Sequence, residues 1–189
     1  VQKPQSVDIS DELPTHPRKR YQTRNLDQID YLVIHHTATS SQITPRLVAE
    51  HHVKNLDWPG IGYHFVIGPE GNIAQCNRLE TVSYHAGEWN PVSVGICLVG
   101  SFEEAPPTSA QLEGASHLCA WLLETLNLSL EWVKGHGDLL ETGCPGRLWF
   151  HGGGWQEELR RGIGKVLGGS GTEEIKSIDH YLLFGGRED

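Results

Sequence analysis

A glycine-rich loop in the second half of the chain constrains the protein more than any other stretch. Residues 135–146 read GHGDLLETGCPG, which places His136 and Cys144 eight positions apart among glycines and one proline. A loop of this composition can turn both side chains toward one point, and an imidazole with a thiolate is a typical pair of zinc ligands. Zinc is held by at least three protein ligands. The loop therefore predicts a further ligand elsewhere in the chain.

An apolar strand upstream supplies candidates for that ligand. Residues 31–39 read YLVIHHTAT, so a buried strand runs directly into His35 and His36. Successive side chains of a strand point to opposite faces, so only one of the two histidines can join the metal. Two histidines and one cysteine leave a fourth position open to water, as in catalytic rather than structural zinc sites. The residues alone leave the choice between His35 and His36 open.

Four stretches follow one another in the order VIHHTAT, WPGIGYHFVIGPEGNI, SYHAGEWNPVSVGICLVG and GHGDLLETGCPG. Together they resemble the zinc-dependent N-acetylmuramoyl-L-alanine amidases, a family that includes the amidase-type phage lysozymes and the peptidoglycan recognition proteins. The resemblance covers about residues 28–165. It implies that a zinc-activated water hydrolyses the amide bond between N-acetylmuramic acid and L-alanine in peptidoglycan. It also implies that the ligands are His35, His136 and Cys144, with His36 left as a core or supporting residue.

The same resemblance implies catalytic roles for two hydroxyl groups. Tyr63 matches the tyrosine of the family's catalytic cleft, and Thr142 matches a position that is lysine in phage lysozymes and commonly threonine in recognition proteins. Each has a plainer alternative, because a strand tyrosine is usually a core residue and a loop hydroxyl often bonds to backbone. Cys97 stands where cytoplasmic recycling amidases carry a glutamate, which excludes a carboxylate base there. The group that protonates the leaving amine is not identified.

Further side chains are expected to contact the substrate. His85 resembles a residue of the family's cleft wall that binds substrate rather than metal. Aromatic faces suit sugar rings and an amide suits peptide carbonyls, so we predict the same role for Trp58, Trp89 and Asn90. Trp58 fits a core position equally well.

Composition restricts the partners. The chain has 189 residues and a net charge of −9, and its basic residues are scattered. A nucleic-acid partner is therefore disfavoured, because binding to a phosphate backbone needs a basic face. No apolar run approaches the ~20 residues of a membrane span. We expect a monomer whose partner is a peptidoglycan muropeptide.

The setting of the protein is inferred from its substrate and cysteines. Action on peptidoglycan favours an extracellular or cell-envelope location, and no targeting signal is visible. Animal recognition proteins usually carry a disulfide after the first strand, and no cysteine pair stands there, which favours a bacterial or phage origin. The absence of methionine suggests a fragment or a processed form.

The order of predicted elements indicates an α/β domain. Strands are expected at residues 31–36, 63–67, 73–75 and 93–99, and helices at 44–54, 109–126 and 155–166. This alternation predicts a single domain with a central mixed β-sheet flanked by helices, as in peptidoglycan recognition proteins. Within the first helix, we expect Leu47, Val48 and Val53 to face inward and His51 and His52 to lie on a solvated face.

Composition along the chain suggests three segments. Residues 1–27 are polar and lack an apolar period, so we expect an N-terminal arm or linker. Residues 28–167 form the predicted amidase domain. Residues 168–189 begin with GGSGT, which is typical of a flexible linker, and we expect them to continue into the start of a truncated second module.

Two other functions agree with part of the pattern. A recognition module that binds peptidoglycan without cleaving it would not need Cys144, and the presence of Cys144 with both histidines argues against this function. A structural zinc domain would need a fourth protein ligand, for which Cys76 is the least unsuitable candidate. Glycoside hydrolysis usually needs two carboxylates that flank a cleft, and the scattered Asp and Glu residues form no such pair. The sequence therefore predicts amide rather than glycosidic cleavage.

Overall fold

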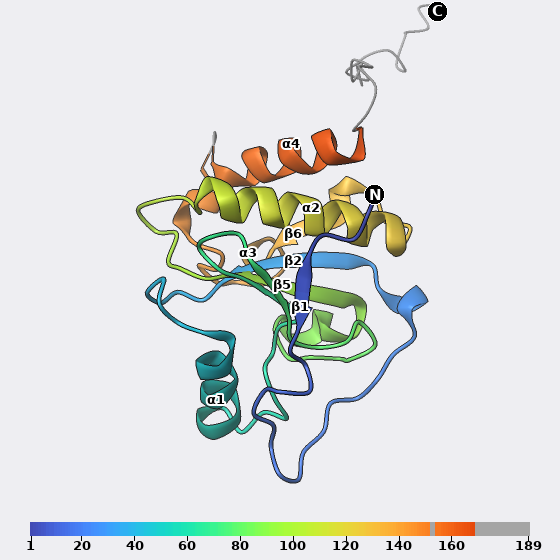
Figure 1. The fold of residues 1–189 in the computed structure, drawn as a ribbon, viewed down its shortest axis with the longest axis vertical. Helices are drawn as coiled ribbons and strands as arrows, with labels where there is room; N and C mark the ends of the chain where they lie inside the picture. Colours follow the sequence, from blue (N-terminus) through green and yellow to red (C-terminus); the bar gives the residue numbers. More distant parts are fainter. Residues whose placement is uncertain (152–153, 169–189) are drawn as a thin grey trace, which may run out of the picture.

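The structure, a computed structural model, describes residues 1–151 and 154–168, and six strands in this part form one mixed sheet (Figure 1). The order across the sheet is β1-β4-β3-β5-β2-β6. Only β3 and β4 run antiparallel, and every other neighbouring pair is parallel. The strands are β1 (Ser6–Asp8), β2 (Tyr31–His36), β3 (Phe65–Ile67), β4 (Ile73–Gln75), β5 (Ser93–Leu98) and β6 (Val133–Gly135). The predicted α/β fold with a central mixed sheet is confirmed.

Helices lie on both sides of this sheet. They are α1 (Pro45–Asn55), α2 (Ser109–Thr125), α3 (His136–Leu139) and α4 (Trp155–Leu167). Figure 1 shows α2 and α4 stacked on one side and α1 on the other. Short 3-10 helices occur at Leu26–Gln28, Gly87–Val92, Leu130–Trp132 and Arg147–Trp149. None of the helices in the described residues is long and apolar enough to cross a membrane.

Helices α1 and α2 begin where the sequence predicts. The Thr44 hydroxyl accepts a hydrogen bond from the Leu47 backbone N–H at 3.3 Å, and Pro45 opens α1. The Thr108 hydroxyl accepts from the Gln111 backbone N–H, and the Gln111 side chain returns a bond to Thr108, so α2 begins with a capping box.

Alternation along the strands decides which residues reach the site. Leu32 and Ile34 of β2 enter the core that also holds α2 and α4, whereas Cys97 of β5 packs with residues of α1 on the other face. His35 lies opposite Cys97 in the β2–β5 register. His36 points to the α2 side, where its Nδ1 accepts from the Phe102 backbone N–H at 3.3 Å. The two adjacent histidines are thus divided between the faces of the sheet.

The predicted faces of α1 are partly wrong. Leu47, expected inside, is 51% exposed, and His52, expected in solvent, is only 7% exposed. The Nδ1 atom of His52 accepts from the Gly62 backbone N–H at 3.0 Å. Because α1 packs over the loop that precedes β3, its inward face comprises Val48, Ala49 and His52.

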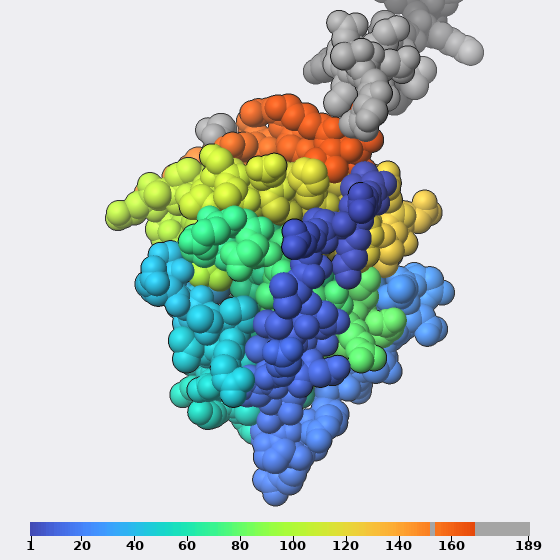
Figure 2. All heavy atoms as spheres, in the orientation of Figure 1, coloured from blue at the N-terminus to red at the C-terminus, as the bar shows by residue number. Residues whose placement is uncertain are grey.

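Residues 1–27 pack against the domain rather than extend from it. β1 pairs in parallel with β4, Leu13 is 9% exposed in the core under α1, and the Tyr21 hydroxyl donates to the Gly60 carbonyl at 2.8 Å. Figure 2 shows this segment as a continuous band over one surface of the molecule. A three-residue edge strand carries no readable period, so the sequence pattern missed it. The linker and second module predicted at residues 168–189 lie, from residue 169 on, outside the described residues.

Candidate metal centre

Two neighbouring parallel strands carry the predicted histidine ligands to one place. Ile34 of β2 lies opposite Gly135 of β6, so the next residues, His35 and His136, are neighbours with ring centroids 4.6 Å apart. The loop after α3 then returns Cys144, whose Sγ lies 3.6 Å from Nδ1 of His35. Ligand atoms of these three residues all lie within 4.8 Å of one another. Within residues 1–151 and 154–168, no other three His, Cys, Asp or Glu side chains are grouped in this way.

The donor set fits a zinc-type cation. Bonds of 2.0–2.3 Å at a tetrahedral angle separate two ligand atoms by about 3.5 Å, and the Cys144 Sγ to His35 Nδ1 distance is 3.6 Å. Burial lowers the pKa of both His35 and His136, so both imidazoles are neutral, as metal ligation requires. Burial also raises the pKa of the Cys144 thiol to about 11. A bound cation would therefore displace one proton from this cysteine.

A carboxylate holds the loop that carries His136 and Cys144 in shape. The Oδ2 atom of Asp138 accepts from the Gly135 backbone N–H at 2.7 Å, at the start of α3. The Gly137 N–H donates to the Cys144 carbonyl at 2.7 Å, which brings the two ends of the ligand loop together. Asp138 was not among the residues predicted from the sequence. Its position three residues after a helix N-cap was the available signal.

Tyr63 lies beside the ligand set. Its ring centroid is 5.3 Å from that of His35, and its hydroxyl hydrogen-bonds with the Cys97 thiol. Burial raises the pKa of Tyr63 well above its usual value, so the hydroxyl keeps its proton. Tyr63 lines a cavity of about 250 Å³ together with Thr37, Thr39, Ile43, Val48, His51 and His52. Among the seven residues that line this cavity, Tyr63 is the one predicted from the sequence to belong to the site.

Thr142 and His85 are placed differently from one another. The Thr142 side chain is exposed, and its hydroxyl accepts from the Cys144 backbone N–H at 3.3 Å, which is the plainer alternative considered for it. His85 is 7% exposed and lies under the ligand set, with Nδ1 3.0 Å from Nε2 of His35. Both ring nitrogens of His85 lie within hydrogen-bonding distance of protein side chains, and a contact of His85 with substrate stays a prediction.

The three remaining predicted substrate contacts do not line this cavity. Trp58 is half-buried against His52, with ring centroids 4.8 Å apart. Trp89 packs edge-to-face on Tyr31, at the opposite end of β2 from His35, with centroids 5.2 Å apart. The Oδ1 atom of Asn90 accepts from the backbone N–H groups of residues 85 and 86 at 2.9 and 2.7 Å. Contacts of these residues with substrate stay a prediction.

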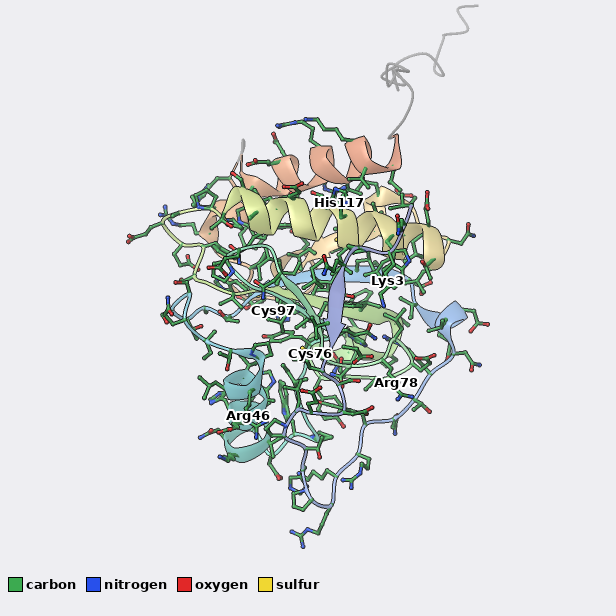
Figure 3. The ribbon with its side chains drawn as sticks, in the orientation of Figure 1. Lys3, Arg46, Cys76, Arg78, Cys97 and His117 are labelled. Carbon is green, nitrogen blue, oxygen red and sulfur yellow. The ribbon has the colours of Figure 1, made fainter. Side chains whose placement is uncertain are left out.

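The other cysteines do not complete a four-ligand site. Cys97 is fully buried in the sheet layer between α1 and α2 (Figure 3), and burial raises the pKa of its thiol well above the usual value. Cys76, the alternative fourth ligand, is buried in the core under α1 and is not part of the ligand group. Among the described residues, the group consists of three ligands.

The sequence of the chain is similar to those of known proteins. The sequence profile of the family described as N-acetylmuramoyl-L-alanine amidase matches residues 25–147. Peptidoglycan-recognition protein SC1a of Drosophila melanogaster is 33% identical over 136 residues, which cover 67% of this chain and 74% of that protein.

Two solved structures share the fold. The endolysin LysCS from Clostridium intestinale URNW, an N-acetylmuramoyl-L-alanine amidase, is 27% identical, with a TM-score of 0.70 over 86% of this chain and 97% of that chain. Peptidoglycan recognition protein-LE in complex with tracheal cytotoxin, a monomeric peptidoglycan, is 29% identical, with a TM-score of 0.67 over 75% and 88%. The chain therefore belongs to the N-acetylmuramoyl-L-alanine amidase family.

Proposed function

We propose that this protein is a zinc-dependent N-acetylmuramoyl-L-alanine amidase that cleaves the bond between N-acetylmuramic acid and L-alanine in peptidoglycan. The observation that carries the proposal is the three-ligand group of His35, His136 and Cys144 beside Tyr63. Membership of the amidase family and the likeness to an amidase endolysin support it. The likeness to a recognition protein solved with a peptidoglycan fragment supports a muropeptide as the substrate.

Each residue of the proposed site has a separate role in catalysis. Zinc, when bound by His35, His136 and Cys144, supplies a Lewis acid that lowers the pKa of water toward about 7 and polarises a carbonyl. The protonated hydroxyl of Tyr63 is a donor for the oxyanion that forms as the amide carbonyl is attacked, although it hydrogen-bonds with the Cys97 thiol in this structure. The Thr142 hydroxyl is a second donor, although it accepts a backbone hydrogen bond within its own loop. The ligands stay neutral or singly charged, so the bound zinc would keep a net charge of about +1.

The two alternative functions are less well supported. A recognition module that only binds peptidoglycan needs no ligand set, whereas this chain holds all three ligand atoms within 4.8 Å. A structural zinc site is closed by four protein ligands, and the described residues supply three. An active enzyme explains the open fourth position best. We further propose that the protein acts as a monomer on the cell wall, outside the cytoplasm.

A metal assay paired with a digest of purified peptidoglycan tests the proposal. We expect one zinc per chain, new amino-terminal L-alanine in the digest, and glycan strands that keep their full length. Reducing sugar ends that appear as turbidity falls, or a new amine from inside the stem peptide, would show that another bond is cleaved.

Ligand variants connect the metal to the activity. Cys144→Ser and His136→Ala should each lose both zinc and hydrolysis. His117→Ala is the matched control, because His117 is an exposed histidine on α2, a helix that packs on the other face of the sheet from His35 (Figure 3). Stoichiometric zinc in either ligand variant would contradict the assignment.

A further inference from the structure

A chain of hydrogen bonds runs from a backbone carbonyl to the ligand His35. The Ser93 hydroxyl lies 2.6 Å from the carbonyl oxygen of Trp89 and 3.3 Å from Nε2 of His85. Nδ1 of His85 lies 3.0 Å from Nε2 of His35. On the other side of its ring, Nδ1 of His35 lies 3.6 Å from the Sγ of Cys144. Ser93, His85 and His35 are 0%, 7% and 1% exposed, so this series of hydrogen bonds is buried.

The Trp89 carbonyl at one end determines which atom donates in each hydrogen bond of this series. A carbonyl only accepts, so at 2.6 Å the Ser93 hydroxyl must donate its single proton to Trp89. The Ser93 oxygen can then only accept from His85, which places the His85 proton on Nε2. In a neutral imidazole the other nitrogen is an acceptor, so Nδ1 of His85 accepts from Nε2–H of His35. The Nδ1 atom of His35 is left with its lone pair directed toward Cys144.

The opposite direction is not compatible with the same contacts. It would point the Ser93 proton at His85 and leave two oxygen lone pairs facing each other across 2.6 Å. Protonated imidazoles would also break the order, but His35 and His85 are 1% and 7% exposed and are bonded here to each other, to a hydroxyl and to a thiol, so a charged ring would lack a compensating partner. Both rings are therefore neutral, and one arrangement of protons remains.

The His85 ring packs against residues of strand β5. A Cβ atom on Gly95 would lie 2.7 Å from Cγ of His85, so the imidazole rests directly on the glycine backbone. Ser93, two residues earlier on β5, lies on the same face of the strand and meets the far end of the ring. Strand β5 thus supplies both the floor under His85 and the acceptor that orients it.

We propose that His85 and Ser93 are positioning residues that hold His35 in the tautomer with Nε2 protonated and Nδ1 free for the metal. The inference rests on the proposed function, because it assigns a role toward the zinc of that site. Ligating histidines commonly donate their second N–H to a fixed acceptor, and loss of such an acceptor typically weakens metal binding about 10–100-fold. Here the acceptor is itself a histidine, whose own tautomer is set by Ser93.

The tautomers can be observed directly in the metal-free protein. Long-range ¹H–¹⁵N correlation of the histidine rings should show His35 and His85 both neutral, with protonated Nε2 and bare Nδ1. Because no zinc is needed, this measurement tests the inference even if the wild-type protein fails to bind zinc and the proposed function falls. An Nδ1–H tautomer of His35 would overturn the inference.

Zinc affinity measured by competition with a chromophoric chelator gives the second test. Ser93→Ala and His85→Leu should each bind zinc at least about 10-fold more weakly than the wild-type protein. His85→Gln should recover part of the loss, because its side-chain carbonyl can accept from His35. The matched control is Ser116→Ala, which removes an equally buried hydroxyl that donates to the Leu112 carbonyl at 2.7 Å within α2.

Thermal unfolding of the metal-free variants separates positioning from folding. The inference requires that Ser93→Ala and Ser116→Ala lose similar stability while only Ser93→Ala loses zinc affinity. Unchanged zinc affinity in both Ser93→Ala and His85→Leu, or an equal loss in the Ser116→Ala control, would overturn it.

Discussion

The Oδ2 atom of Asp138 accepts a hydrogen bond from the indole Nε1 of Trp149 at 3.0 Å. The same oxygen accepts from the Gly135 backbone N–H at 2.7 Å. Both His136 and Cys144 lie between Gly135 and Trp149 in the sequence. One carboxylate oxygen therefore connects the residues that flank the segment carrying these two proposed ligands. Trp149 is 1% exposed, so its hydrogen bond to Asp138 anchors the segment to the core.

Asp138→Ala should therefore weaken the site without removing a ligand. The change leaves the buried N–H groups of Gly135 and Trp149 without a partner, which should lower the free energy of unfolding by about 1–3 kcal/mol. Urea unfolding measures this loss, and chelator competition should show weaker zinc binding. Glu141→Ala, an exposed acid in the same loop, is the control. Wild-type zinc affinity in Asp138→Ala would show that the loop keeps its shape without the carboxylate.

The stability of the protein should fall in mild acid because of His52. Burial lowers the pKa of His52 from 6.5 to about 4 in the folded state. Between these values the unfolded chain takes up a proton that the folded chain does not, so folding stability is lost as the pH falls from about 6.5 to 4. Urea unfolding from pH 4 to 8 should show that His52→Gln takes up about one proton fewer on unfolding in this window. Identical pH profiles for variant and wild type would rule out this role.

The amino-terminal segment should contribute to stability. Leu13 is 9% exposed and packs in the core under α1, so Leu13→Ala should lower the free energy of unfolding by about 2–4 kcal/mol. Val7 on β1 is 64% exposed, and Val7→Ala is expected to change little. Denaturant unfolding compares the two. Equal, small effects would mean that residues 1–27 behave as the free arm that their composition suggests.

The grouping of His35, His136 and Cys144 was predictable because each of them has a strong local context. The apolar run of β2 predicts a buried strand. Because side chains alternate along a strand, His35 and His36 must face opposite sides of the sheet. Which of them faces the metal depends on the side of the sheet that α1 covers, and this is a long-range property. The resemblance to a family, rather than the strand itself, supplied that choice.

The residues that contact His35 from outside the ligand group were not predictable, because these contacts also depend on long-range packing. His35 and His85 are 50 residues apart, and their contact depends on the pairing of β2 with β5 and on the absence of a side chain at Gly95. His52 is a polar residue at a position that composition assigns to solvent. It is buried because Gly62 brings a backbone N–H to its ring. The three-residue strands β1 and β6 were not predicted, because neither segment contains a run of apolar residues.

Tyr63→Phe should separate the chemical step from metal and substrate binding. The Tyr63 ring packs 5.3 Å from the His35 ring and lines the cavity, and phenylalanine keeps that packing. Loss of one oxyanion donor typically lowers kcat about 10²–10³-fold. We therefore expect this loss in muropeptide hydrolysis, with zinc content and KM close to wild type.

The matched control for this prediction is Tyr31→Phe, which removes a hydroxyl from the far end of β2 and should leave kcat unchanged. Loss of zinc from Tyr63→Phe would mean that the hydroxyl supports the ligand set through Cys97, its hydrogen-bond partner. An unchanged kcat would make Tyr63 a packing residue and leave Thr142 as the remaining donor. The exposed Thr142 hydroxyl already accepts from the Cys144 N–H, so Thr142→Val should then show the larger fall in kcat.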